Sequence, residues 1–283
     1  MSSSERRPAT PPQAKVFLEG RYRKLSRDLP QTVFFCPDCK GHPRRRRGCA
    51  RCEGFGKLTR DSVQELVGWV LGAAFKTRKH KFHGAGREDV NVRMLGAGRS
   101  FVIELIAPRQ LDVDLAACEA EINRRNAGRL EVLGLHWTEK ARVSAIKEAR
   151  RAKEYRALVR TSGAPDAEAL ARVLGQRITI RQRTPGRVAH RRADLERERW
   201  LELVSCAPAE DGWDVLLRTQ HGTYVKEAIS GEDGATEPSL SGLLGVACEC
   251  VALDVTAILD EEGREPEAAP APAPRAPGFG ADL

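Results

Sequence analysis

The stretch KFHGAGREDVNVRMLG, from Lys81 to Gly96, places a short acid between a glycine-containing loop and an alternating apolar run. This acid is Asp89, and it follows Arg87 by two residues. Taken alone, the pattern favours an acid at the shoulder of a hairpin, paired with Arg87 or Arg93. The other interpretation is a positioned nucleophile. A paired acid–base role is not expected, because the neighbouring Glu88 would face the opposite side of a strand.

The segments around this stretch mix strand and helix patterns. VNVRML and SFVIELI flank residues 96–99, and two β-rich runs around a short glycine turn predict a hairpin. Strands and helices do not alternate strictly, so the sequence predicts an α+β domain with a largely antiparallel sheet flanked by helices. The predicted helices are 115–126, 138–154 and 166–174, and the predicted strands are 90–95, 100–106, 129–137, 155–160, 177–183, 199–206, 213–219 and 246–255.

The composition is that of a globular chain with a core: of 283 residues, 41% are hydrophobic and 30% are charged. Its apolar runs fall short of the ~20 residues of a membrane span. The start, MSSSERRPATPP, lacks the apolar middle of a signal peptide. We therefore expect a cytoplasmic protein with no membrane partner. In a reducing cytosol, four of the eight cysteines are expected to bind metal rather than form disulfides.

Charge is distributed unevenly around a net value of +8. Residues 1–60 hold fifteen Lys and Arg against five Asp and Glu, whereas residues 260–283 hold six acids against two arginines. The basic front end favours a polyanionic partner such as nucleic acid, with a merely solvated basic surface as the alternative. Aromatic residues make up only 5% of the chain, which argues against a stacking surface of the kind that single-strand binders use.

Two Cys-x-x-Cys pairs lie close together, Cys36 with Cys39 and Cys49 with Cys52. Four thiolates at this spacing predict a closed tetrahedral site for structural zinc. A redox pair is the alternative that a lone Cys-x-x-Cys would leave open. The other four cysteines lie in apolar patterns and are expected in the core. The loop between the pairs predicts a phosphate contact, unless it is simply solvated, because it carries Arg44, Arg45, Arg46 and Arg47.

Composition also suggests boundaries along the chain. Residues 1–14 are rich in Ser and Pro and residues 263–283 in Ala and Pro, so both ends are expected to be disordered. Between them we expect a basic segment with the four-cysteine module at 15–60 and a main domain at 61–262. The segment Thr184-Pro185-Gly186 is a loop signal inside a basic cluster. That cluster comprises Arg183, Arg187, His190, Arg191 and Arg192.

Several segments resemble those of one enzyme family, in the same order. Residues 86–89 resemble the Gly-Arg-x-Asp segment that carries the nucleophilic aspartate of pseudouridine synthases. The wider match is to the archaeal and eukaryotic family, the Pus-ten type, that makes pseudouridine at tRNA positions 54 and 55. It covers most of residues 16–257. The matching segments are GRYRKLSRDLPQT (20–32), KFHGAGREDVNVRMLG (81–96), EVLGLHW (131–137), QRTPGRVAHRRAD (182–194) and GTYVKEAISGEDGATEPSLSGLLG (222–245).

The resemblance implies the pseudouridine-synthase fold, with residues 61–262 as the catalytic domain. A uridine of tRNA is flipped out of its stack, and Asp89 attacks either uracil C6 or the ribose anomeric carbon. The glycosidic bond breaks, and a carbon–carbon bond then forms from C5. No cofactor or small molecule is implied for catalysis, and the protein is expected to act as a monomer.

The resemblance also assigns supporting roles. Tyr224 would stack under the base, and Lys226 would pair with Asp89 and keep it ionised. On a strand, Tyr224 and Lys226 would point the same way. Leu240 would form an apolar wall of the uracil pocket. The residues expected at the RNA are Arg87 near the flipped nucleotide, the basic cluster of residues 183–192 and the arginines of the four-cysteine module.

Two features depart from the family pattern. Few residues precede Gly20, so the N-terminal THUMP-like domain of larger members is expected to be missing, with the four-cysteine module doing part of its work. Asn91 stands where a second aspartate is expected. A non-catalytic interpretation also stays open, because residues 49–56 resemble the zinc repeats of DnaJ-type chaperones. The chain would then be a zinc-dependent RNA-binding protein or RNA chaperone, and would bind tRNA without changing its nucleosides.

Overall fold

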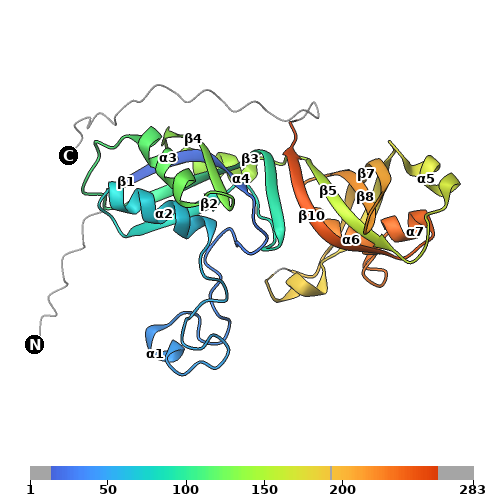
Figure 1. Cartoon of the computed structure of the whole chain (residues 1–283), viewed down its shortest axis with the longest axis horizontal. Coiled ribbons are helices and arrows are strands. Elements are labelled where there is room, and N and C mark those ends of the chain that lie inside the picture. Colours follow the sequence, from blue (N-terminus) through green and yellow to red (C-terminus); the bar gives the residue numbers. More distant parts are fainter. Residues whose placement is uncertain (1–13, 192, 261–283) are drawn as a thin grey trace, which may run out of the picture.

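The computed structural model describes residues 14–191 and 193–260, which build one continuous sheet of strand order β4-β1-β3-β10-β5-β8-β7-β6-β9, with β2 beside β3 (Figure 1). Every pairing between these strands is antiparallel except that of β10 with β3. The predicted α+β class is therefore confirmed. The strands are β1 (Lys15–Lys24), β2 (Lys79–Gly84), β3 (Val92–Ile106), β4 (Leu130–Thr138), β5 (Lys153–Thr161), β6 (Arg177–Arg183), β7 (Glu196–Ala209), β8 (Gly212–Thr219), β9 (Thr236–Glu237) and β10 (Cys248–Ile258).

One half of the molecule contains β1 to β4. Strand β1 pairs with the outer part of β3, from Lys15 opposite Ile106 to Tyr22 opposite Arg99, and on its other side with β4. Residues 15–24 were expected in the basic segment ahead of the main domain and no strand was predicted there, but their hydrogen bonds make them part of the sheet. Helix α3 packs against β4 and α2. The helices of this half are α2 (Val63–Ala74), α3 (Leu115–Arg125) and α4 (Ala141–Glu148).

The other half contains β5 to β10. Strands β10, β5, β8, β7 and β6 follow one another in antiparallel order, and along β8 the side chains alternate between a buried and a more exposed face. Helix α6 packs on β10 and on α7. One buried apolar cluster continues through both halves, from Leu18 and Phe101 to Leu217 and Ile229. The helices of this half are α5 (Ala167–Val173), the 3-10 helix η1 (Gly186–Arg191), α6 (Val225–Ser230) and α7 (Leu240–Leu244).

The two halves meet where strand β10 lies beside β3 in the middle of Figure 1. The pairing is short and parallel, from Leu253 opposite Val92 to Val255 opposite Met94. Asp254 strengthens it, because its carboxylate accepts from Arg93 Nε at 2.9 Å and lies 2.8 Å from Arg27 Nη2. We call this line, residues 92–94 with 253–255, the seam. The candidate site described below lies beside it.

The predicted hairpin at residues 90–106 is wrong. Both runs belong to the single strand β3, and the glycines between them form a bulge: β1 steps from Tyr22 to Lys24 while β3 steps from Arg99 to Met94. Gly96 and Gly98 have φ values of 58° and 78°, a left-handed conformation that suits glycine. Two β-rich runs around glycine fit a turn and a bulge equally well, so the local pattern could not decide between them.

Two further predictions need correction. The helix expected over 138–154 ends at Glu148, because Lys153 and the residues after it pair with β10 and β8 instead. Tyr224 and Lys226 do not lie on a strand. Tyr224 is the N-cap of α6, and Lys226 lies in the first turn of that helix. The predictions of the helix at 115–126 and of the strand at 177–183 are confirmed, and the structure shows Asp114 as the N-cap of that helix.

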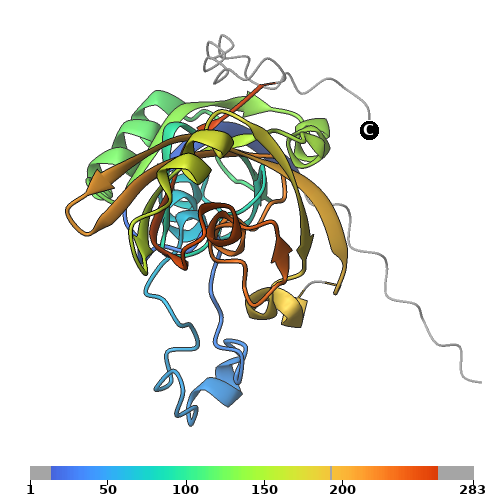
Figure 2. The ribbon, with the colours of Figure 1, turned by 90° about the vertical axis from the view of Figure 1, so that its right-hand side faces the viewer.

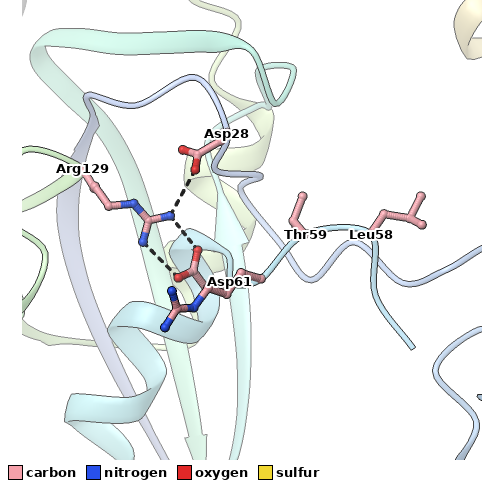
Figure 3. A pocket seen from close by; sticks show the side chains of 6 residues that line it. Asp28, Leu58, Thr59, Asp61 and Arg129 are labelled. Atoms are coloured by element: carbon pink, nitrogen blue, oxygen red, sulfur yellow. Dashed lines mark hydrogen bonds and ion pairs between the residues drawn. The ribbon is translucent and has the colours of Figure 1, made fainter. Parts of the chain in front are cut away.

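Residues 34–58 form a small module that stands apart from the sheet in Figures 1 and 2. A bridge between Phe35 and Lys57 closes its base, and α1 (Pro43–Arg46) lies within it. Just after the module, Arg129 binds both carboxylate oxygens of Asp61 at 3.0 and 2.9 Å and lies 3.7 Å from Asp28 (Figure 3). Arg129, Asp61 and Asp28 line a hollow that lies where the module joins the sheet.

The expected tail at 263–283 lies outside the described residues, as does the expected N-terminal tail up to residue 13. Within the part that the structure describes, no helix is both long enough and apolar enough to cross a membrane.

Candidate active site

Asp89 lies in the loop between β2 and β3, and its backbone is held by Lys24 at the end of β1. The Lys24 ammonium donates to the carbonyl oxygens of Leu29, Asp89 and Val90 at 2.9, 2.8 and 2.9 Å. Lys24 is fully buried, and this burial lowers its pKa to about 8. Three carbonyls use all three donors of one ammonium, so Lys24 fixes the position of the Asp89 backbone.

Glu88, next to Asp89, is a buried anchor for the same loop. Its carboxylate lies 2.8 Å from Arg99 Nε and accepts from the Tyr22 hydroxyl at 2.8 and 3.0 Å. Gln31 donates to that hydroxyl and to the carbonyl of Gly86. Burial, together with the Glu88 charge, raises the pKa of Tyr22 well above its usual value. The Glu88 side chain therefore faces the interior, whereas the Asp89 side chain faces the seam.

Two cations from the other half of the molecule reach the Asp89 carboxylate. Arg187 Nη1, from η1, donates to Oδ2 at 2.7 Å, and Lys226 Nζ, from α6, lies 3.6 Å from the same oxygen. The Asp89 side chain is 30% exposed, so the group is held but open to solvent. Asp89 comes from one side of the seam and both cations come from the other. The site is therefore complete only when the two halves are joined.

Each cation has a second partner that orients it. Arg187 donates to the buried Glu227 through Nη2 at 3.1 Å and also through Nε. Burial alone would lower the pKa of Arg187, but the hydrogen bonds and charge of Glu227, with Asp89, raise it. Lys226 donates to the Asn91 side-chain oxygen at 3.0 Å. Asn91, the residue that departs from the family pattern, therefore holds the lysine beside Asp89.

Tyr224 lies beside the two cations. Its backbone is fixed by the Gln182 side chain, which accepts from the Tyr224 N–H at 2.7 Å and donates to its carbonyl at 3.0 Å. The Arg187 guanidinium carbon lies 5.9 Å from the centre of the ring. An aromatic face next to a carboxylate and two cations can hold a flat, polar base.

The other predicted residues lie at varied places. Leu240 is fully buried at the start of α7, and Arg87 is exposed in the Asp89 loop. Arg183 pairs with Asp194, with Nε 2.9 Å from a carboxylate oxygen. The four arginines at 44–47 are exposed on the four-cysteine module. Arg192 lies outside the described residues, as do the side chains of His190 and Arg191.

The four cysteines of the module converge. All four sulfurs lie within 4.8 Å of one another, with Cys36 and Cys49 at 3.7 Å and Cys39 and Cys52 at 3.6 Å. A tetrahedral zinc–thiolate site has sulfurs about 3.8 Å apart, given Zn–S bonds of about 2.3 Å. Backbone N–H groups of Cys39 and Asp38 help to lower the pKa of Cys36 to about 7, and the Gly56 N–H approaches the Cys52 sulfur at 3.1 Å. The donor set therefore fits a metal ion.

Comparison with known proteins identifies the family. A family model described as "Pus10, C-terminal" matches residues 17–259. The chain belongs to the Pus10 family. Its relatives include proteins named "tRNA pseudouridine synthase Pus10" from Methanothermobacter marburgensis, 46% identical over 85% of this chain, and from Methanopyrus kandleri, 44% identical over 88%. The aligned regions are 59% and 57% of those two Pus10 proteins, so the chain spans somewhat over half the length of the relatives that it matches.

The family assignment rests on the Pus10 relatives, and the similarity to solved structures is weak. A Cbf5–Nop10–Gar1 complex aligns over 69% of this chain and 45% of its own, with 20% identity and a TM-score of 0.37. That similarity is too low to carry an inference about this member of the Pus10 family.

Several residues of the site were missed by motif and pattern. Arg187 was expected at RNA, but its Nη1 donates to the Asp89 carboxylate at 2.7 Å. Tyr22 and Lys24 lie in the segment GRYRKLSRDLPQT, to which no individual roles were assigned. Arg99, which is 1% exposed, was assigned to a turn. The available signal for Arg99 was its place at the start of an apolar run expected to be a buried strand. A charge that is buried in a strand requires a partner of opposite charge.

Proposed function

We propose that this chain is a tRNA pseudouridine synthase that isomerises uridine in the T-arm, at position 55 with position 54 as a second target. The carrying observation is the position of Asp89. Its carboxylate lies 2.7 Å from Arg187 and 3.6 Å from Lys226, in a chain whose family relatives are named tRNA pseudouridine synthases. We assign Asp89 as the covalent nucleophile.

The two cations suit that role. Opposite charges within about 4 Å orient a carboxylate, and a carboxylate oxygen can attack carbon as a covalent nucleophile. With uridine flipped toward the seam, Asp89 bonds to uracil C6 or to the ribose anomeric carbon, and the glycosidic bond to N1 breaks. The base rotates, C5 bonds to the ribose carbon, and the bond between Asp89 and the substrate carbon breaks, which returns the free carboxylate; the C5 proton leaves and N1 is protonated. Substrate and product are isomers, so no oxidant or reductant is consumed.

Tyr224 and Leu240 are proposed to hold the base. The tyrosine ring would stack under the flipped uracil, with its position set by the Gln182 hydrogen bonds. Leu240 would contribute the apolar wall from α7. Since Asp89 and all of these residues come from one chain, a monomer is sufficient for the reaction. In this proposal the catalytic domain includes β1 and the 59–260 region, with the four-cysteine module inserted at 34–58.

The four-cysteine module is proposed to bind structural zinc through Cys36, Cys39, Cys49 and Cys52. Bound zinc would cross-link the module and take no part in the isomerisation. The exposed arginines at 44–47 would then contact tRNA phosphate. The Arg129 contacts to Asp61 and Asp28 support a fixed junction between this module and the sheet.

The test is Asp89→Asn incubated with a T-arm tRNA transcript. We expect pseudouridine formation to fall to background, a loss of at least about 10⁴-fold, because an amide is not a nucleophile at this site. tRNA affinity should stay within about threefold of wild type, since only one carboxylate oxygen is replaced. Arg160→Ala, which removes an exposed arginine of β5 that pairs with Glu249, is the control that should keep activity. Pseudouridine formation at the wild-type level by Asp89→Asn would sink the assignment. If the wild-type chain bound tRNA but formed no pseudouridine, the non-catalytic alternative would be favoured.

A further inference from the structure

Four cations lie around Arg199 and His221, in the part of the site that precedes Tyr224 in the chain, and none was assigned a role above. Arg197 and Arg199 lie at the start of β7, and Arg150 and Lys153 lie where the chain passes from α4 into β5. We call these four residues the β7 cation cluster. Within the described residues, none of the four makes an ion pair with an acid, although arginines are commonly paired elsewhere on this sheet.

The sheet register places three of these side chains on one face. Lys153 and Leu201 both pair with Thr219, and Arg199 precedes Leu201 by two residues, so their side chains share a face. Arg197 lies opposite Gln182 on β6. Gln182 is the residue that holds the Tyr224 backbone, so this face is also the face of the candidate site.

Arg199 lies closest to the site. Its Nε and Nη2 atoms are 3.7 Å from the position that a Cβ on Gly222 would occupy, two residues before Tyr224. Nη1 donates to the Glu198 carbonyl at 2.6 Å. The Nε atom is buried and has no acceptor in the part of the chain that the structure describes. A charged group is therefore placed beside the site without a carboxylate to balance it.

Like charges in the cluster face one another. Burial, and then Arg197 and Arg150, lower the pKa of Arg199. Burial, and then Arg199, Arg150 and Lys153, lower the pKa of His221. Repulsion of this kind is relieved when an anion binds between the cations. Lys153 also lines a hollow that includes Arg151 and Arg142.

We propose that Arg150, Arg197 and Arg199 bind a backbone phosphate of the RNA strand next to the flipped uridine. This inference rests on the proposed function, because it places the RNA by the position of Tyr224. A phosphate is the anion that flanks every nucleotide, and guanidinium groups bind it in bidentate fashion. Lys153 would add charge without direct contact.

The test is the double variant Arg150→Ala/Arg199→Ala, with Arg156→Ala/Arg177→Ala as the matched control. The control also removes two arginines, but these are paired to Asp214 and Glu202 on the opposite face of the sheet. The measurements are the Kd for a T-arm RNA across a range of salt concentrations, and KM and kcat for pseudouridine formation.

For Arg150→Ala/Arg199→Ala, the slope of log Kd against log salt should fall by about 0.8, since the single phosphate contact that is lost contributes roughly 0.7 to 0.9. KM should rise roughly tenfold at physiological salt while kcat stays within about twofold. Arg150→Lys/Arg199→Lys should recover most of the slope, because lysine keeps the charge. The control should match wild type.

An unchanged Kd and slope in the alanine double variant would overturn the phosphate site. Because the slope is measured on binding, it decides this question even if the wild-type chain forms no pseudouridine. That second result would overturn only the proposed function.

Discussion

Arg187 joins two carboxylates of different character. Asp89 is 30% exposed and faces the seam, whereas Glu227 is buried and accepts two hydrogen bonds from the same guanidinium. The planar fork of arginine binds Glu227 through two nitrogens and still reaches Asp89 with a third, a bidentate geometry that lysine lacks. Lys226 contacts Asp89 less closely, because its Nζ lies 3.6 Å from the Asp89 carboxylate. It is oriented by a hydrogen bond to Asn91.

We predict that Arg187→Ala lowers both the stability and the activity of the protein more than Lys226→Ala does. Loss of Arg187 leaves Glu227 buried without a partner, so the free energy of unfolding should fall by about 2–4 kcal/mol. Lys226 is 26% exposed, and its loss should cost less than about 1 kcal/mol. Single-turnover pseudouridine formation should fall roughly 100-fold for Arg187→Ala and roughly tenfold for Lys226→Ala.

Urea unfolding and single-turnover assays on both variants check this order, and Glu227→Gln in the Arg187→Ala background provides the control. The added change removes the unpaired charge and should restore about half of the lost stability without restoring the rate. Equal stability losses in the two single variants would contradict the assigned role of Arg187.

Sequence reasoning identified residues of the site that occur in short motifs and missed those that act through distant contacts. Asp89 and Lys226 were both recognised from local segments. Arg187 was placed in a basic loop, because nothing in its neighbourhood indicates a carboxylate 98 residues away. Lys24 presented the same difficulty, since a lysine at the end of a strand is ordinarily exposed. Its burial is decided by three backbone carbonyls that only the fold brings together.

At the scale of elements, the seam is a short interface within the sheet and depends on Asp254. Burial alone would raise the pKa of this carboxyl, but the hydrogen bonds and charges of Arg93 and Arg27 hold it below its ordinary value. A carboxyl with a lowered folded-state pKa stabilises the fold above its unfolded-state pKa of about 4. The contribution is lost as pH falls through the folded-state value.

Asp254→Asn should therefore lower the free energy of unfolding by about 2 kcal/mol at pH 7, a figure reduced because both arginines are more than a third exposed. The difference from wild type should shrink as pH falls below about 4. Urea unfolding of both proteins at about pH 7 and about pH 3.5 measures it. Asp194→Asn, which breaks an exposed ion pair with Arg183, should leave the unfolding curve close to that of wild type at either pH. A constant gap between Asp254→Asn and wild type at both pH values would exclude the ionised seam contact as its cause.

Most strands were predictable because their alternation reflects burial on one face, as at 177–183. The errors occurred where tertiary pairing overrides local pattern. The glycines at 96 and 98 could form a turn or a bulge, and β1 selects the bulge. Residues 149–154 have a helix-like sequence, but from Lys153 onward the chain pairs as a strand between β8 and β10. Tyr224 lies in a β-like run, yet it caps a short helix that ends at Gly231, whose φ is 90°.

For the whole molecule, the four-cysteine module and the sheet should behave as separable units. One zinc ion per chain is expected, and a chelator that removes it should unfold residues 34–58 alone. The sheet should keep its unfolding transition within about 1 kcal/mol, because the cysteine cluster of the module is separate from the buried apolar cluster of the sheet. tRNA affinity should fall as the arginines at 44–47 lose their fixed positions.

Zinc release followed by a colorimetric indicator, together with circular dichroism and tRNA binding, tests this separation. Cys36→Ser/Cys39→Ser should reproduce the effect of the chelator, and Cys206→Ser, which lies outside the cluster, should not. Global unfolding on zinc removal, or a chain that never contains zinc, would contradict the prediction.

The position of β10 has a further consequence for how the chain is synthesised and folds. A ribosome releases Asp89 early, Arg187 emerges 98 residues later, and β10, which must insert between β3 and β5, is the last of the described strands to appear. A nascent chain therefore carries the proposed nucleophile through 98 residues of synthesis before Arg187 is added and through 137 before Lys226 is added. If the proposed function holds, catalytic competence should arrive only with this last described strand, and an incomplete chain that meets tRNA should leave its uridines unchanged.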